Sequence, residues 1–379
     1  MIFELNEEQA LIQKMVKELA ETVIEPLGKQ IDEENRIPDE IMKQLKELEL
    51  FGLPYPEELG GSGAGYTAYP PALEQIAKAS SGVALMLSVH YLGMSAIDKF
   101  GNAGQRKKYL VPACRGDSIL SFAFTEPGTG SDPKQVATTY RKEGGAYILN
   151  GVKRFISNAD LNGPIVIFAN EEGSVGRTSA FIVEKMCEGY SLSEPWHKIG
   201  LRGSRAYDIF LNDVKVPAED LLGEEGRGFP VLQHGIACGK LGMSTLFLGV
   251  MQASLDEAVK YALGKPYRDK TISKFQAVQL KIADMAAKVE AARWLVYRLG
   301  YLLEHMTSME SFNRESALTK LFVTDTAMEV VRKGVSVHGS YGVMDEFKVE
   351  RLYRDVVIGE QIEGANDLQR IMVCNGLLK

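Results

Sequence analysis

The feature that most constrains this chain is a change in the spacing of its apolar residues. Up to about Phe100 the spacing is three or four positions, the period of an amphipathic helix, as in Leu11, Met15, Leu19 and Val23. Between about Ile119 and Gly223 the apolar runs are short and bounded by Gly, Asn or Pro, as in strands. After Phe229 the helical spacing returns. The pattern therefore predicts a β region between two helical regions.

The order of these regions predicts a multidomain α+β protein. At 379 residues the chain is long enough for two or three domains. We place an all-α domain at residues 1–118, a middle β domain at residues 119–226 and a helical bundle at residues 227–379. No helix-length window separates the strands, which favours an antiparallel sheet. Asn6, with Gln9 three residues later, is placed to cap the first helix.

Charge and composition exclude several classes of function. The net charge of −7 provides no basic field, which argues against nucleic acid and anionic membrane surfaces as partners. The N-terminal segment lacks a secretory signal pattern and no stretch approaches a membrane span, so we expect a cytoplasmic protein. The four cysteines and five histidines show no ligand spacing, so we expect no metal site.

The most specific segment is FAFTEPGTGSD, residues Phe122 to Asp132. An apolar strand runs into Thr125 and then into a Pro-Gly turn that ends at Gly130-Ser131. Such a turn offers backbone N–H groups, a hydroxyl and a close approach for a planar or phosphorylated ligand. The alternative is an ordinary turn between strands.

The residue order of this segment resembles TEPxAGSD, a signature of the acyl-CoA dehydrogenase family. Three further segments are similar to family motifs in the same order: LNGVKRFISNA (Leu149 to Ala159), DVKVPAEDLLGEEGRGF (Asp213 to Phe229) and RDVVIGEQIEGANDLQR (Arg354 to Arg370). The family's fold, a helical domain, a β domain and a C-terminal four-helix bundle, agrees with the pattern above. The resemblance implies a flavoenzyme that binds FAD and an acyl-CoA.

Residue by residue, the resemblance implies a set of contacts to FAD. They are Phe122, Phe124 and Thr125 along the flavin ring, Gly130 and Ser131 at its phosphate and ribityl side near the CoA, Phe155 in place of a tryptophan that stacks on the ring, and Ser157 in place of a threonine that faces the reactive edge. Phe155 keeps an aromatic face and Ser157 keeps a hydroxyl, so we expect FAD to bind here.

The resemblance also implies that Glu363 is the catalytic base, since it stands at the glutamate of the family's IYEGT motif. Removing the proton next to a thioester carbonyl requires a carboxylate, and apolar neighbours such as Ile358 and Ile362 would raise its pKa. Glu360 is interpreted as a solvated residue. Some relatives carry the base before the DVKVP segment, where this chain has Ala206. The backbone N–H of Glu363 is expected to help to hold the enolate oxygen.

The chain departs from the family where the FAD pyrophosphate is expected. Lys265 replaces an arginine that reaches the pyrophosphate across a subunit contact, and Lys lacks the bidentate fork of Arg. Arg268 stands nearby as a substitute. The other residues that we assign to the cofactor are Gln276, which is retained, Ser340, which replaces a glycine, and Ala365 and Asp367 after the catalytic Glu-Gly pair.

The substrate is less defined than the cofactor. The segment Ser81 to Gly93 corresponds to the helix that closes the acyl pocket, and His90 and Tyr91 are bulky there. They favour a short, branched, cyclic or functionalised acyl group; alternatively, both pack between helices. The further residues that we assign to the substrate are Ser131, Tyr207 and Gly364.

The function that we expect is FAD-dependent oxidation of an acyl-CoA to the 2,3-enoyl-CoA. Electrons would pass to an electron-transfer flavoprotein, and the family resemblance implies a homotetramer, or a dimer. Three alternatives remain: an enoyl-CoA reductase, a relative that adds decarboxylation or another elimination, and a binding or assembly subunit that has lost FAD.

Overall fold

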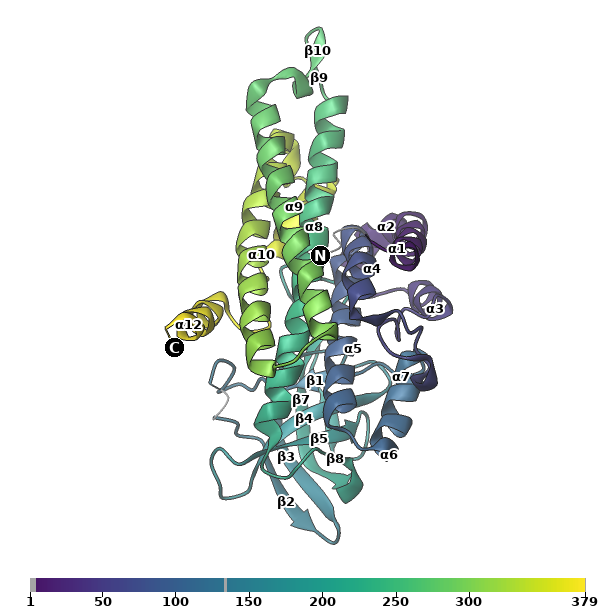
Figure 1. The fold of residues 1–379 in the computed structure, drawn as a ribbon, viewed down its shortest axis with the longest axis vertical. Helices are drawn as coiled ribbons and strands as arrows, with labels where there is room; N and C mark the ends of the chain where they lie inside the picture. Colours follow the sequence, from purple (N-terminus) through teal and green to yellow (C-terminus); the bar gives the residue numbers. More distant parts are fainter. Residues whose placement is uncertain (1–4, 133–134, 379) are drawn as a thin grey trace.

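The structure, a computed structural model, describes residues 5–132 and 135–378. The molecule is elongated, with three long C-terminal helices at one end, the sheet at the other and the N-terminal helices along the side (Figure 1). The predicted order of a helical part, a β part and a helical bundle is confirmed.

The N-terminal part is built from short helices around two longer ones. They are α1 (Glu7–Leu19), a π-helical turn (Ala20–Ile24), α2 (Glu25–Glu34), α3 (Asp39–Glu47), a 3₁₀ turn (Glu57–Leu59), α4 (Gly65–Ala79), α5 (Ser81–Phe100), α6 (Ala103–Gln105), a second π-helical turn (Arg106–Leu110) and α7 (Val111–Cys114). The predicted cap is confirmed, because the Asn6 side chain accepts from Gln9 N and the Gln9 side chain accepts from Asn6 N.

The middle part is one sheet. Its strands are β1 (Ser121–Ala123), β2 (Thr139–Glu143), β3 (Ala146–Ser157), β4 (Pro164–Glu171), β5 (Thr178–Glu184), β6 (Tyr190–Leu192), β7 (Ala206–Pro217) and β8 (Leu221–Leu222), in the order β6-β7-β3-β2-β4-β5-β8 with β1 also paired to β4. The two long strands β3 and β7 pair along most of their length.

The sheet is mixed: most of its pairs are antiparallel, as predicted, but β1 and β2 both pair with β4 in parallel. Parallel neighbours usually need a helix between them. Here the intervening β2–β3 hairpin, turning at Gly144 and Gly145 with φ of 56° and 82°, supplies the crossover length instead.

The C-terminal part holds three long helices and two shorter ones. They are α8 (Gly228–Gly264), α9 (Gln276–Glu304), α10 (Met309–His338), α11 (Lys348–Val356) and α12 (Asn366–Leu377). The connections between them include the small β9–β10 hairpin (Pro266–Tyr267 and Lys270–Thr271) and two 3₁₀ turns (Ile272–Lys274 and Gly339–Val343). A third 3₁₀ turn (Ala218–Asp220) lies before α8. The fourth place in the bundle is taken by α11, which packs on α8 and α10.

Helix α8 is the central helix of the molecule. It packs against α4 and α5 of the N-terminal part as well as against α9 and α10 (Figure 1). It is long and apolar enough to cross a membrane, although we expected no stretch of the sequence to approach a membrane span. However, 89% of its most apolar window is buried inside the protein, as in a core helix.

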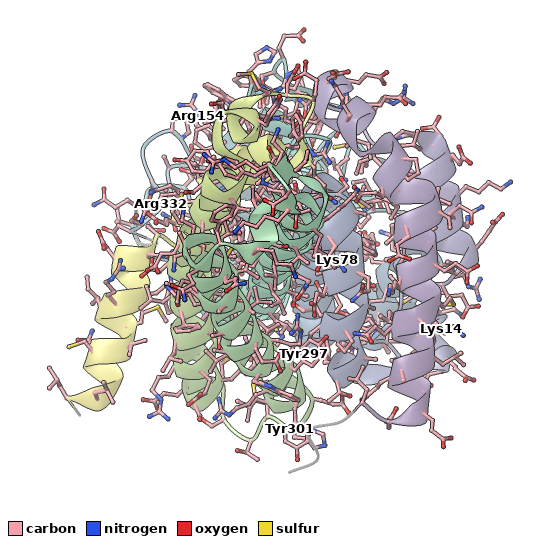
Figure 2. All side chains as sticks on the ribbon, turned by 90° about the horizontal axis from the view of Figure 1, so that it is seen from above. Lys14, Lys78, Arg154, Tyr297, Tyr301 and Arg332 are labelled. Atoms are coloured by element: carbon pink, nitrogen blue, oxygen red, sulfur yellow. The ribbon has the colours of Figure 1, made fainter. Side chains whose placement is uncertain are left out.

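Seen along the long axis, the N-terminal helices and the bundle stand side by side, and α12, which contacts α10, projects from the side of the bundle (Figure 2). Lys14 marks α1, Lys78 marks α4 and Tyr297 marks α9 in that view. Lys78 pairs with Asp256 of α8 at 2.9 Å, so polar contacts as well as apolar packing join the two helical parts.

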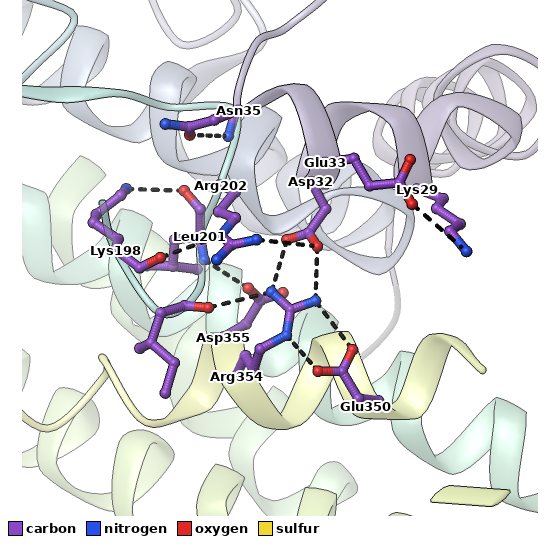
Figure 3. A network of polar contacts seen from close by, with 12 residues as sticks. Lys29, Asp32, Glu33, Asn35, Lys198, Leu201, Arg202, Glu350, Arg354 and Asp355 are labelled. Atoms are coloured by element: carbon purple, nitrogen blue, oxygen red, sulfur yellow. Dashed lines mark hydrogen bonds and ion pairs between the residues drawn. The ribbon is translucent and has the colours of Figure 1, made fainter. Parts of the chain in front are cut away.

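A polar network joins all three parts beneath α11 (Figure 3). Arg354 of α11 forms a two-point ion pair with Asp32 of α2, at 2.9 and 2.7 Å, and also binds Glu350. The next residue, Asp355, accepts from Ser81 Oγ of α5 at 2.7 Å and from Leu201 N, ahead of β7, at 2.6 Å. This network fixes the start of the segment that leads from α11 to α12.

Replacing Arg354 with Met is therefore expected to lower the free energy of unfolding by about 2–4 kcal/mol, because Glu350 would lose its cation and Asp32 would keep only Arg202, at 4.0 Å. The matched control is Arg370→Met, whose carboxylate partners are exposed and whose loss should cost at most about 1 kcal/mol. Urea unfolding measures both. An equal loss of unfolding free energy in the two variants would show that the network around Arg354 does not stabilise the fold more than a surface ion pair does.

Candidate active site

A buried ion pair holds the turn that follows β1. Glu126 lies 2.6 Å from Lys153 of β3, and both side chains are almost fully buried. Glu126 also accepts from Ala137 N at 2.6 Å and from Thr138 N at 3.1 Å. Burial would raise the pKa of Glu126, but Lys153 and these donors hold it below its usual range. Arg154 N donates to Thr125 O at 2.7 Å, so the turn and β3 move as one unit.

An exposed aromatic face lies beside this turn. Phe155 sits in a bulge of β3, with φ of 60°, and its side chain is 55% exposed. Trp196, between β6 and β7, meets it edge-on at a centroid distance of 5.2 Å and donates to Asp208 at 2.9 Å. A left-handed conformation is rare for an aromatic residue, and such strain gathers at functional sites. The protein thus holds an apolar ring outward at some conformational cost.

Glu363 lies in the turn between α11 and α12. Its backbone is left-handed, with φ of 53°, and the following Gly364 has φ of 85°. The residue is partly exposed, yet its Oε1 atom is buried without a hydrogen-bond partner. A Cβ at Gly239 of α8 would overlap Oε1, so the carboxyl group lies directly against that glycine. A buried, unpartnered carboxyl oxygen is costly unless a ligand or a proton uses it.

Helix α8 brings the predicted base next to the predicted flavin residues. A Cβ at Gly235 would lie 2.9 Å from the ring of Phe122, at β1. Gly235 and Gly239 are four residues apart, a rise of about 6 Å along a helix. The side chain of Leu92, on α5, borders both glycines. Two groups of residues that are far apart in sequence therefore meet on one face of α8.

The environment of Glu363 adjusts its acidity. Burial raises its pKa to about 7, and the ammonium groups of Lys240 and Lys320 limit the rise. A carboxyl group with a pKa near neutrality can both accept and return a proton at neutral pH. Glu363 is thus suited to general-base chemistry.

The residues predicted for the pyrophosphate form a separate group at the far tip of the bundle (Figure 1). Lys265 follows α8 and its Nζ lies 4.6 Å above the ring of Tyr341, next to Ser340. Arg268 turns the β9–β10 hairpin and Gln276 begins α9. From Gly239 to Lys265 the axis of α8 rises about 39 Å. Within one chain, this group does not meet the residues around Phe155.

The remaining predicted residues divide between the surface and the core. Gly130 and Ser131 are exposed beside the turn, Ser157 is half-buried at the end of β3, and Phe124 is buried against Phe168. Ala365 is the N-cap residue of α12, and Asp367 is exposed and paired with Arg370 at 3.0 Å.

Three residues predicted to bind substrate have partners within the protein. His90 accepts from Leu120 N at 3.0 Å and packs against Phe51, while the Tyr91 hydroxyl donates to Leu50 O. Tyr207, which is buried in β7, donates to Asp160 at 3.1 Å. The structure does not bring these side chains to Glu363. The residue of α5 that lies near Glu363, beside Gly239, is Leu92.

Comparison with known proteins identifies the architecture. The N-terminal, middle and C-terminal domains of acyl-CoA dehydrogenase match residues 6–117, 121–214 and 226–378. This chain belongs to the acyl-CoA dehydrogenase family. Members of this family are oxidoreductases acting on CH–CH groups, and two residues of its motif segments here, Phe122 and Glu363, lie against α8.

Two relatives with assigned activities are reductases. The chain is 39% identical to 3-(aryl)acrylate reductase of Clostridium sporogenes over 99% of both chains. It is 36% identical to the CarC subunit of the caffeyl-CoA reductase-Etf complex of Acetobacterium woodii, again over 99% of both.

Solved structures of acyl-CoA dehydrogenases are among those that resemble the chain. Butyryl-CoA dehydrogenase of Megasphaera elsdenii superimposes with a TM-score of 0.96 at 32% identity over 100% of both chains. An acyl-CoA dehydrogenase of Bacillus anthracis, solved as a complex with FAD, gives a TM-score of 0.92 at 31% identity over 99% of this chain and 67% of that one.

Several residues of this candidate site were not predicted from the sequence. Trp196 and Gly239 carry no local signal. Lys240 and Lys320 do, because each is a lone cation in an apolar helical stretch, GIACGKLGM and ALTKLFV. A charge on a buried helical face is rare enough to suggest a polar partner.

The raised pKa of Glu363 has a measurable consequence for stability. Because the folded-state pKa of about 7 lies above the ordinary 4.5, the contribution to stability is complete below about pH 4.5 and is lost as the pH rises through 7. Glu363→Gln stays uncharged, so it should be more stable than the parent by about 1–3 kcal/mol at pH 8 and should match it near pH 4. Urea unfolding at both pH values tests this, with Glu360→Gln as the control for loss of a carboxylate. If the free energies of unfolding of the parent and of Glu363→Gln changed with pH in parallel, the burial of the charge would be contradicted.

Proposed function

We propose that this protein oxidises an acyl-CoA thioester to the 2,3-enoyl-CoA, with Glu363 as the base and FAD as the cofactor. The observation that carries the proposal is the unpartnered Oε1 of Glu363, lying against Gly239 one helical turn from the Phe122 ring. A base beside an aromatic-lined surface is what removal of an α-proton next to a flavin requires.

The residues present fit FAD. Phe155 and Trp196 offer an exposed apolar face for a planar ring, while Phe122 lies in β1 and Ser157 at the end of β3. When bound, FAD supplies the acceptor for the β-hydride. The exposed Gly130-Ser131 turn would approach its phosphate and ribityl side.

The separate group at the bundle tip supports a homo-oligomer. Lys265, Arg268, Gln276 and Ser340 lie too far along the bundle to reach the same FAD as Phe155. If they bind the pyrophosphate, they do so for the FAD of a second copy. We therefore propose a homotetramer, or a dimer, that completes each cofactor site.

In the proposed reaction, each residue near α8 has one task. The Glu363 carboxylate accepts the α-proton and, with a pKa of about 7, releases it readily afterwards. Leu92 and Phe122 exclude water from the carboxyl group, and the missing side chain of Gly239 leaves it room. The backbone N–H of Glu363, which donates to no backbone acceptor among the described residues, is free for the enolate oxygen.

A reductase working in the opposite direction is the second candidate, because two relatives are named reductases of aryl or caffeyl substrates. The same Glu363 would then protonate the α-carbon. A dehydrogenase would reduce its flavin when the purified protein is mixed with acyl-CoA alone. A reductase would convert enoyl-CoA to acyl-CoA when a reduced flavoprotein donor is added. Decarboxylation or another elimination would be recognised from the product.

We propose an electron-transfer flavoprotein as the redox partner, by analogy with the Etf complex that contains CarC, and the cytoplasm as the location. A colourless protein that gains no flavin spectrum on addition of FAD would instead favour a binding or assembly subunit.

The base is tested by Glu363→Gln, which fills nearly the same volume but does not accept a proton at neutral pH. Flavin reduction by acyl-CoA should slow by about 10²–10⁴-fold while FAD and acyl-CoA still bind. Anaerobic rapid-mixing absorbance measures the rate, and Glu360→Gln is the control three residues away. A variant that reduces the flavin within tenfold of the parent would exclude Glu363 as the sole base.

The pyrophosphate assignment is tested by Lys265→Ala, which should lose FAD on dialysis more readily while the bound fraction reacts at the parent rate. The reason is that Lys265 is assigned to the pyrophosphate of the FAD and not to the flavin ring, which accepts the hydride. Arg268→Ala is the matched variant from the same hairpin. If only that variant sheds flavin, Arg268 and not Lys265 binds the pyrophosphate.

A further inference from the structure

Two buried lysines flank Glu363. Lys240, on α8, is 2% exposed, and Lys320, on α10, is fully buried. A buried ammonium group is costly unless it is paired. Neither lysine has a carboxylate oxygen within 4.0 Å among the described residues, so neither forms an ordinary ion pair there. Their burial therefore needs another explanation.

Lys320 binds the turn that carries Glu363. Its Nζ donates to Gly364 O at 2.9 Å and to Asn366 Oδ1 at 2.7 Å. Gln369 Nε2 also donates to Gly364 O, at 3.1 Å. Since Glu363 is left-handed, which is rare for a residue with a side chain, its backbone is strained and needs such bonds to persist. Lys320 thus fixes the backbone from which the carboxyl group projects.

Asn366 extends this contact into α10. Its amide nitrogen donates to Thr324 Oγ1 at 2.9 Å and to Asp325 Oδ1 at 2.7 Å. The turn is consequently tied to α10 at three points rather than to solvent.

Lys240 acts through charge instead of through hydrogen bonds. It follows Gly239, the residue against which the Glu363 carboxyl group rests, and it has no hydrogen-bond partner within residues 5–132 and 135–378. Besides Glu363, the charged groups that bear on the lysine pair are Asp325 and Glu360, both near Lys320. Around the carboxyl group itself, two cations face one anion.

We propose that Lys240 and Lys320 are positioning residues that aim the Glu363 carboxyl group and keep it ionised for proton abstraction. The proposal rests on the proposed function of Glu363. The ammonium groups of the two lysines would also favour the negative charge that develops on a thioester oxygen. In agreement, burial lowers the pKa of both lysines to about 8, and both lower that of Glu363.

The test is the pH dependence of flavin reduction in Lys240→Met and Lys320→Met. Removing a cation favours the protonated carboxyl group, so the acid limb of the rate profile should move to higher pH. A shift of one pH unit from about 7 would slow the reaction about fivefold at pH 7 and leave it near the parent rate by pH 9. Lys240→Arg and Lys320→Arg should restore most of the loss at pH 7.

A matched control separates charge from structure. Lys185 is also buried and bonded only to Ile119 O, Asn158 O and the Ser121 hydroxyl, so Lys185→Met should lower stability without moving the acid limb. A second readout needs neither turnover nor FAD: the infrared band of the protonated Glu363 carboxyl group, identified by its loss in Glu363→Gln, should titrate at higher pH in the lysine variants.

The outcomes distinguish this proposal from the function on which it rests. If Glu363→Gln still reduces the flavin, the assignment of the base fails whatever the lysines do. If Glu363→Gln is inactive but the Lys→Met variants keep the parent acid limb and the parent infrared titration, the lysines are structural and this proposal is overturned.

Discussion

Close packing along α8 is the constraint on which the rest of the site depends. Gly235 and Gly239 lack side chains at the points where the Phe122 ring and the Glu363 carboxyl group approach the helix. A Cβ at Gly239 would occupy the place of the carboxyl oxygen, so that one position decides whether Glu363 can enter the interior. Because α8 also contacts α4, α5, α9 and α10, a shift of this helix would disturb every part of the molecule at once.

The same packing explains the chemistry of the buried charges. An isolated carboxylate in the interior would simply take up a proton, and an isolated ammonium would lose one. Here one carboxyl group and two ammonium groups share a small volume, which brings the pKa of Glu363 to about 7 and those of the lysines to about 8. All three groups therefore change charge close to neutral pH, where proton transfer needs the least energy.

The supports of the site lie some distance from it. Arg354 and Asp355 fix α11 to the N-terminal helices and to the segment before β7, and α11 leads directly into the turn of Glu363 (Figure 3). On the other side, the Glu126–Lys153 pair fixes the turn after β1 against β3. The aromatic face and the base are thus held by two separate polar frameworks, and α8 sets the distance between them.

The sequence by itself determined what depends on local order. The spacing of apolar residues predicted the three parts, the Asn6–Gln9 pair marked the first cap, and the motifs singled out Glu363 and Phe155, because these signals are contained in a few neighbouring residues. Only the tertiary structure decided that β1 and β2 run parallel to β4 and that His90 and Tyr91 bond within the protein. It alone brought Lys240 and Lys320 to Glu363 and left Lys265 at the far tip. Those outcomes depend on which distant segments pack together, and a buried charge acquires its pKa from neighbours that no local pattern encodes.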